Sequence, residues 1–462
     1  MSTTRVWPVP PSLTWGQRYG RPDELWWMLT PATPVRCSGP SHGGGARVSA
    51  GEVQPREPGP ADPANRFVSR APKLGYAPAL DGMRGIGVML VILVHAVFVP
   101  FASFALVVDM FFVISGFLIT TLLLEEDRRS GSVSLRRFYT RRALRLLPML
   151  YLVLVGTLVA VLGVHLLTDN RDLLDKAISD VIAGGTYMYH VVHPVHIELV
   201  GGGDAVIRPL LQLWSLSVEE HFYVIGVLTI LFVVRRRWIT QLIVVFTAAW
   251  VFIGIARFTG HVGPRFAWYQ RPDALMLGVV LAFVNARLPT VWSPRFEAAM
   301  RRAATVATAV LLLTIFVGMT ASKPLGIYVP FLVPEGGSLR DGLYWGKFGF
   351  SIASACFAVI VITLARYPDH GLGRFLARPF FTKVGARSYG IYLLHVPIGV
   401  LLMETVAKRS EGLALLMYLP ILIVVQEITH RYVELPAMRL KVRTADAGAS
   451  GAVVEPPAPD RT

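Results

Sequence analysis

The chain has 462 residues, of which 53% are hydrophobic and 16% charged, and its mean hydropathy is +0.51. This composition excludes an ordinary soluble domain. The net charge of +15 does not indicate a nucleic-acid partner, because the arginines stand in short segments between long apolar runs. Two cysteines are too few for a disulfide framework.

The amino-terminal part differs in kind from the rest. Residues 1–75 are rich in Pro, Gly and Arg and have no sustained apolar period, so we expect a disordered extension or a translation start assigned too far upstream. The apolar run at 26–29 is too short for the core of a signal peptide. We expect residues 76–440 to form a membrane domain and residues 441–462 to form a disordered cytosolic tail.

Ten segments approach the length of about 20 apolar residues that a helix needs to cross a bilayer. They lie at about 84–102, 105–125, 146–167, 213–234, 239–256, 272–286, 303–320, 346–366, 388–407 and 413–431. Alternate connecting segments are rich in Lys and Arg, which places them and both termini in the cytosol. The sequence therefore predicts an all-α, multi-pass membrane protein.

The first apolar segment carries a histidine. Asp81 and Arg84 precede the run, and His95 lies within it. Arg84 and His95 are close to three helical turns apart, so they share one helix face about 16 Å apart along the axis. An ionisable side chain inside the membrane is costly, which makes His95 a functional candidate.

Polar residues also interrupt the second segment and the basic loop after it. Ser115 precedes Gly116, which favours close helix packing, although a substrate contact is the alternative. Arg141, Arg142 and Arg145 follow in the loop. They indicate either a topology signal or a clamp for phosphate oxygens, because guanidinium groups bind such oxygens two at a time.

The start of the fourth segment reads WSLSVEEHFY and contains Glu219, Glu220 and Tyr223. Two adjacent carboxylates point in different directions on a helix. We expect one to face the bundle as an acid beside a buried histidine, with a structural ion pair as the alternative.

Asp81, Tyr223 and three further residues qualify as candidates for substrate contacts. Arg271 and Asp273 open the sixth segment, and His395 lies inside the ninth. A hydrogen-bonded packing role is the alternative for His395. The run HVVHPVH at 190–196 is interrupted by proline, so we expect no metal site there.

Taken together, the chain resembles the acyltransferase-3 family of integral membrane O-acyltransferases. The matching pieces are LDGMRGIGVMLVILVH, DMFFVISGFLI, RRALRLLPML, WSLSVEEHFY, RPDALMLG and SYGIYLLHVP, in the order of the family and over about residues 76–440. The sequence departs from the family at His221, where members usually have Gln, and the SGNH-type hydrolase domain that some members append is not expected here.

The resemblance implies transfer of an acyl group, commonly acetyl, from cytosolic acyl-CoA to a hydroxyl of a carbohydrate or lipid acceptor. It implies that His95 is catalytic and that Arg84, the RRALR arginines, Glu219, Glu220 and Tyr223 are motif residues. Acyl-CoA is then a donor substrate, and we expect no permanently bound cofactor. A carboxylate at 219 or 220 is expected to orient the imidazole of His95.

Transport is the rival interpretation of the same residues. Charged groups inside a bundle of helices also suit a transporter or flippase for a glycan or lipid. Release of free thiol from acyl-CoA distinguishes the two, because only acyl transfer produces it.

Overall fold

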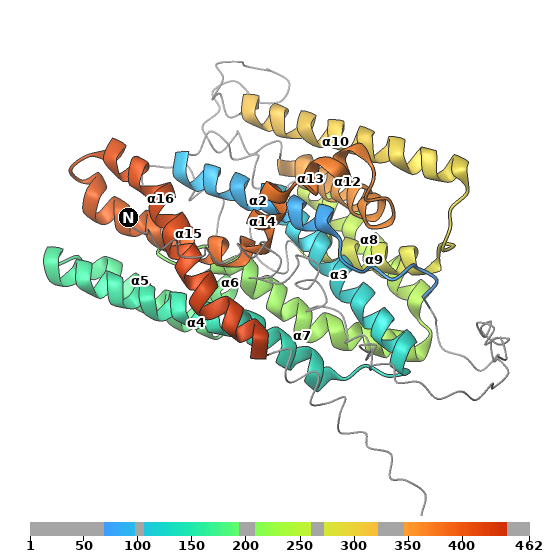
Figure 1. Cartoon of the computed structure of the whole chain (residues 1–462), viewed down its shortest axis with the longest axis horizontal. Helices are drawn as coiled ribbons and strands as arrows, with labels where there is room; N and C mark the ends of the chain where they lie inside the picture. Colours follow the sequence, from blue (N-terminus) through green and yellow to red (C-terminus); the bar gives the residue numbers. More distant parts are fainter. Residues whose placement is uncertain (1–68, 98–105, 194–207, 260–271, 322–345, 441–462) are drawn as a thin grey trace, which may run out of the picture.

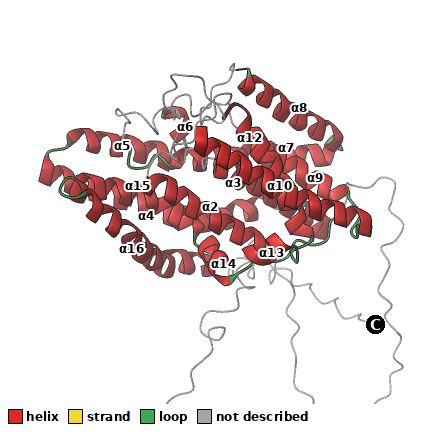
Figure 2. Ribbon diagram, turned by 90° about the horizontal axis from the view of Figure 1, so that it is seen from above, coloured by secondary structure: helices red, strands yellow, loops and turns green. Residues whose placement is uncertain are grey.

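The computed structural model describes residues 69–97, 106–193, 208–259, 272–321 and 346–440. The regular structure in these ranges is helical throughout, as Figures 1 and 2 show. The helices are α2 (Pro78–Val97), α3 (Val107–Ser130), α4 (Leu135–Thr168), α5 (Arg171–Gly185), α6 (Tyr189–Val192), α7 (Leu213–Arg236), α8 (Ile239–Phe258), α9 (Asp273–Arg287), α10 (Pro294–Ala321), α12 (Gly346–Arg366), α13 (Gly371–Leu376), α14 (Pro379–Ala386), α15 (Ser388–Leu402) and α16 (Glu411–Thr429). Two π-helical turns, η4 (Met403–Ala407) and η5 (His430–Glu434), follow α15 and α16.

Each of the ten expected segments corresponds to a helix. Among the described residues, eight helices are long and apolar enough to cross a membrane. The first expected segment corresponds to α2, and its last residues, 98–102, lie outside the described part. The sixth corresponds to α9, whose 15 residues fall short of the roughly 20 that a span needs. The chain is therefore an all-α, multi-pass membrane protein with eight candidate spans among the described residues.

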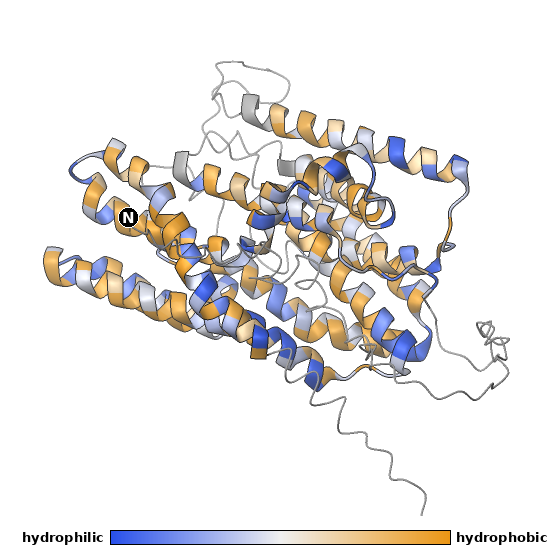
Figure 3. Ribbon diagram, in the orientation of Figure 1, coloured by the Kyte–Doolittle hydropathy of each residue, from blue (hydrophilic) through white to orange (hydrophobic). Residues whose placement is uncertain are grey.

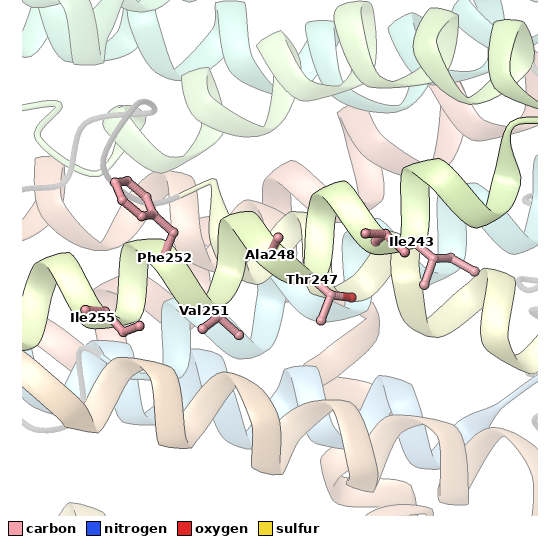
Figure 4. Close-up of a pocket in the computed structure, with 7 residues that line it drawn as sticks. Ile243, Thr247, Ala248, Val251, Phe252 and Ile255 are labelled. Atoms are coloured by element: carbon pink, nitrogen blue, oxygen red, sulfur yellow. The ribbon is translucent and has the colours of Figure 1, made fainter.

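Large apolar side chains are exposed along α4, α7, α8 and α16, and Figure 3 shows hydrophobic residues in orange along these helices. The clearest case is a shallow groove along α8, whose side chains appear in Figure 4. It is lined by Ile243, Val244, Thr247, Ala248, Val251, Phe252 and Ile255. None of these side chains is ionisable, so we interpret this surface as a lipid contact rather than a reaction site.

Glycines bring the central helices into backbone contact. A Cβ atom at Gly116 of α3 would lie 2.3 Å from the carbonyl oxygen of Leu275 in α9. A Cβ atom at Gly85 of α2 would lie 2.2 Å from the carbonyl oxygen of Phe381 in α14. The expected close packing at Ser115-Gly116 is thus confirmed for Gly116, and α2 and α3 are held firmly in place.

The chain before α2 is bound to the ends of other helices. The guanidinium of Arg128 donates to the carbonyl oxygens of Ser69 and Ala71, at 3.2 and 3.1 Å. The backbone N–H of Leu74 donates to Glu125 Oε1 at 2.8 Å. Residues 69–74 therefore form an ordered strap, although the sequence suggested disorder up to residue 75. Residues 1–68 and 441–462 lie outside the described part.

The segment between the third and fourth expected spans contains a further helix, α5, which turns back along α4. Helix α5 runs beside α4, as Figure 1 shows, and the hydroxyl of Tyr151 donates to the carbonyl oxygen of Gly185 at 3.2 Å. Tyr151 lies about 25 Å before the end of α4, so α5 returns along most of the apolar part of that helix. The fully buried Asp180 fixes the return, because its carboxylate pairs with Arg208 and accepts from the N–H of Leu210.

Candidate active site

A cavity of about 140 Å³ lies among α2, α3, α4, α7 and α15. Its polar lining combines residues from all five helices, namely Arg84, Ser115, Arg142, Arg145, Ser215, Glu219, Tyr223, Ser388, Tyr389 and Tyr392. Its apolar wall comes mainly from α3, with Val108, Phe111, Phe112, Ile114, Leu118, Ile119 and Leu122. The structure thus brings together six of the residues singled out from sequence: Arg84, Ser115, Arg142, Arg145, Glu219 and Tyr223.

Arg142 is held by two neighbours on α7. Its Nε atom donates to both carboxylate oxygens of Glu220, at 3.0 and 3.2 Å. Its guanidinium carbon lies 3.3 Å from the centre of the Tyr223 ring. The structural ion pair that the sequence left as an alternative therefore exists at Glu220. It orients Arg142 at the edge of the cavity.

Glu219 and Glu220 point in different directions, as expected. Glu219 lines the cavity and accepts a hydrogen bond from Ser115 Oγ at 3.1 Å. In the described part of the chain, the hydrogen bonds of the two carboxylates go to Ser115 and Arg142 and not to His95. The expected orientation of His95 by one of these carboxylates is therefore not present.

His95 instead lies next to a second histidine. The rings of His95 in α2 and His395 in α15 have centroids 5.0 Å apart and planes at 72°. His95 Nδ1 is 2.8 Å from the carbonyl oxygen of Val91, and His395 Nδ1 is 2.6 Å from that of Tyr392. Because a carbonyl only accepts, Nδ1 carries a proton in both rings, so in the neutral form of each imidazole Nε2 has the free lone pair.

The two imidazoles differ in accessibility. The His95 side chain is exposed, whereas His395 is only 1% exposed. His395 Nε2 has no hydrogen-bond partner among the described residues. The pair therefore presents one accessible basic nitrogen with a buried imidazole behind it, which suits proton transfer to and from a substrate.

The remaining predicted residues do not line this cavity, although the charge of Asp81 acts on Arg145, which does. Arg141 forms an ion pair with Glu126 at 3.2 Å. Asp273 forms a buried ion pair with Arg257 at 3.0 Å, which ties α9 to α8. Asp81 lies at the contact with α14, where its carbonyl oxygen faces Gly385. Arg271 lies outside the described residues.

Sequence reasoning missed Ser215, Ser388, Tyr389 and Tyr392. The signal was present as helical spacing. Ser215 shares a face with Glu219 and Tyr223 at intervals of four residues. Tyr392 likewise lies four residues after Ser388 and three before His395. Listing the polar residues along one face of each helix would have identified Ser215 in α7, and Ser388 and Tyr392 in α15.

Comparison with known proteins agrees with this arrangement. A family profile described as an acyltransferase domain, that of the acyltransferase-3 family, matches residues 78–425. The chain belongs to the acyltransferase-3 family. The helices that supply the cavity and the histidine pair all lie within the matched region.

Curated relatives in the family are bacterial O-acetyltransferases. The peptidoglycan O-acetyltransferase OatA of Listeria monocytogenes is 27% identical over 371 residues, covering 78% of this chain and 56% of the relative. The O-acetyltransferase OatA of Staphylococcus aureus is 30% identical over 370 residues, covering 78% and 57%. The chain thus matches a little over half the length of these relatives. No solved structure matches it.

Proposed function

We propose that this chain transfers an acetyl or other short acyl group from cytosolic acyl-CoA to a hydroxyl of a cell-envelope carbohydrate. The observation that carries the proposal is the placement of an arginine-lined cavity and a pair of neutral histidines along the same two helices, α2 and α15. Peptidoglycan is the first acceptor to test, because one relative is named a peptidoglycan O-acetyltransferase. A glycolipid or other polysaccharide is the alternative acceptor.

The cavity suits the donor. Arg84 and Arg145 line it with Arg142, so three guanidinium groups gather at one cavity, where the carboxylates of Asp81 and Glu219 balance only part of their charge. Guanidinium groups favour phosphate oxygens. A cavity of about 140 Å³ is smaller than the roughly 300 Å³ of a typical ligand pocket, so it admits a narrow chain rather than a whole nucleotide. We infer that the pantetheine arm enters while the phosphates stay with the arginines.

The histidine pair supplies the base. His95 Nε2 removes the proton of the acceptor hydroxyl as its oxygen attacks the thioester carbonyl. The bond between carbonyl carbon and sulfur then breaks, and the thiolate of CoA takes up the proton. In the alternative route, His95 first receives the acyl group and passes it on. Rapid quenching of a single turnover with labelled donor separates the two routes, because only the second labels the protein.

The membrane arrangement completes the proposal. We propose ten spans, with α2 and α9 added to the eight candidates, and both termini in the cytosol. The basic connecting segments support this orientation. Fusions of reporter enzymes to residue 462 test it, since a reporter active only outside the cytosol must remain inactive there.

The decisive experiment uses bacterial membranes containing the full chain, radiolabelled acetyl-CoA and peptidoglycan fragments. We expect free thiol and base-labile label on the glycan, both lost in His95→Ala. His165→Ala, which changes a histidine of α4 outside the cavity, is the matched control and retains activity. Wild-type turnover by His95→Ala would refute the proposal. Movement of glycan across the membrane without thiol release would support a transporter instead.

A further inference from the structure

Tyr392 joins the cavity to the histidine pair. Its side chain lines the cavity, while its carbonyl oxygen is 2.6 Å from His395 Nδ1. Its ring also contacts the imidazole of His395, with centroids 5.3 Å apart. The same residue therefore touches the inferred donor site with its side chain and holds the buried histidine with its backbone.

Helix α7 anchors this tyrosine. The hydroxyl of Tyr392 donates to the carbonyl oxygen of Gln212 at 2.9 Å and lies 2.6 Å from Ser215 Oγ. The side-chain amide of Gln212 donates to the carbonyl oxygen of Leu393 at 2.8 Å. Gln212 and Ser215 are buried, so water does not replace these hydrogen bonds easily. Three hydrogen bonds thus tie one turn of α15 to the start of α7.

The position of this turn decides what His395 can do. Its Nδ1–H is committed to the Tyr392 carbonyl, so Nε2 is the nitrogen available beside His95. Tyr418 of α16 holds the same histidine from the other side, by donating to its carbonyl oxygen at 3.0 Å. A shift of α15 relative to α7 would move the His395 ring away from His95.

We propose that Tyr392 is a positioning residue for the acyl transfer, acting through His395 on the geometry of His95. The inference rests on the proposed function. Tyr392 stands within the motif SYGIYLLHVP, but the motif assigns it no role and the mechanism above does not use it. Tyr392 needs no bond to a reacting atom in this role. Its hydroxyl fixes α15, and α15 fixes the imidazole.

The test is Tyr392→Phe, which keeps the ring and removes the hydroxyl with both of its bonds to α7. We expect kcat to fall by between about 10- and 100-fold, the size of effect that a small misplacement of catalytic groups produces. The KM for acetyl-CoA should change less than about twofold, because the ring that lines the cavity remains. Tyr151→Phe removes a phenol that bonds Gly185 outside the cavity, and it should behave as wild type.

A double-mutant cycle ties the effect to the histidine. His395→Ala alone should lower kcat, and adding Tyr392→Phe should cause little further loss, since the residue it positions is gone. Additive losses would overturn the proposal, as would a raised KM with unchanged kcat, which would make Tyr392 a donor contact. If Tyr392→Phe does not accumulate in membranes, Ser215→Ala removes one bond only, and an unchanged kcat there also overturns it.

The outcome separates this inference from the proposed function. If His95→Ala is inactive while Tyr392→Phe is fully active, acyl transfer stands and the positioning role falls. If His95→Ala is active, the proposed mechanism itself is wrong, whatever the tyrosine variant does.

Discussion

Replacing Glu220 by glutamine separates two effects of a charge beside the cavity. In the wild type, Arg142 Nε contacts both carboxylate oxygens of Glu220, and the guanidinium lies against the Tyr223 ring. Glutamine keeps the shape of the side chain, and its one carbonyl oxygen can still accept from Nε and from Nη2, which is 2.5 Å from Oε1 in the wild type. The bond from Nε to the second oxygen and the charge assistance of all three bonds are lost, while the net positive charge around the cavity increases by one.

The two effects predict opposite changes in donor binding. A charge-assisted hydrogen bond contributes about 1.5–3 kcal/mol. If its loss misdirects Arg142, donor affinity falls by about tenfold or more, since 1.4 kcal/mol corresponds to a factor of ten. If only net charge mattered, removing a carboxylate would tighten binding of the anionic donor. We expect the first result, because both side chains are less than 20% exposed and their geometry is closely defined.

The assay is the initial rate of thiol release over a range of acetyl-CoA concentrations in membranes with matched amounts of protein. Glu126→Gln is the control, because it removes the partner of Arg141, which lies outside the cavity. It should leave the KM for acetyl-CoA unchanged. A lower or unchanged KM in Glu220→Gln would refute our reasoning about Arg142. A large loss of kcat at constant KM would show instead that Glu220 is catalytic.

Three further predictions concern stability in detergent. Burial, with a smaller effect of a neighbouring histidine, lowers the pKa of His190 from 6.5 to about 4. As the pH falls, the unfolded chain therefore binds a proton at His190 before the folded chain does. The melting temperature should fall as the pH drops from 6.5 to 4, and this fall should be smaller in His190→Phe. Gly116→Ala places a Cβ atom 2.3 Å from a backbone oxygen and should lower the free energy of unfolding by about 1–3 kcal/mol. Gly156→Ala, whose Cβ atom would have no neighbour within 4 Å, should change it little. Equal melting temperatures of the two variants would contradict this reasoning. Asp273→Asn removes a carboxylate from the buried Arg257, which is 2% exposed, and should cost about 3–5 kcal/mol with an unchanged KM for acetyl-CoA. A raised KM would place Asp273 in the donor site.

Sequence reasoning succeeded where one helix determines the geometry. The spacing of Arg84 and His95 requires only a regular helix, and α2 provides it over Pro78–Val97. The apolar segments likewise predicted the helices, because length and hydropathy are local properties. The adjacent carboxylates at 219 and 220 were expected to point apart, and they do.

Contacts between distant helices were beyond that reasoning. Nothing local to His95 indicates that its neighbour is His395, exactly 300 positions later in the chain, rather than a carboxylate of α7. The return of α5 along α4 was also hidden, because its sequence, RDLLDKAISDVIAGG, is too polar to be recognised as part of the bundle. The partners of Asp180, Arg208 and the backbone N–H of Leu210, explain how a carboxylate is accommodated in the bundle, and they follow Asp180 by about 30 residues.

The strap at residues 69–74 sets a limit on shortening the protein. A version beginning at residue 76 would keep every helix, yet the buried Glu125 would lose the N–H of Leu74, and Arg128 would lose two carbonyl acceptors. The backbone N–H of Arg70, which donates to the carbonyl oxygen of Ala286 at 2.7 Å, would disappear as well. Trimming for expression or crystallisation should therefore stop before Ser69. The ends of α3 and α9 depend on six residues that belong to no helix.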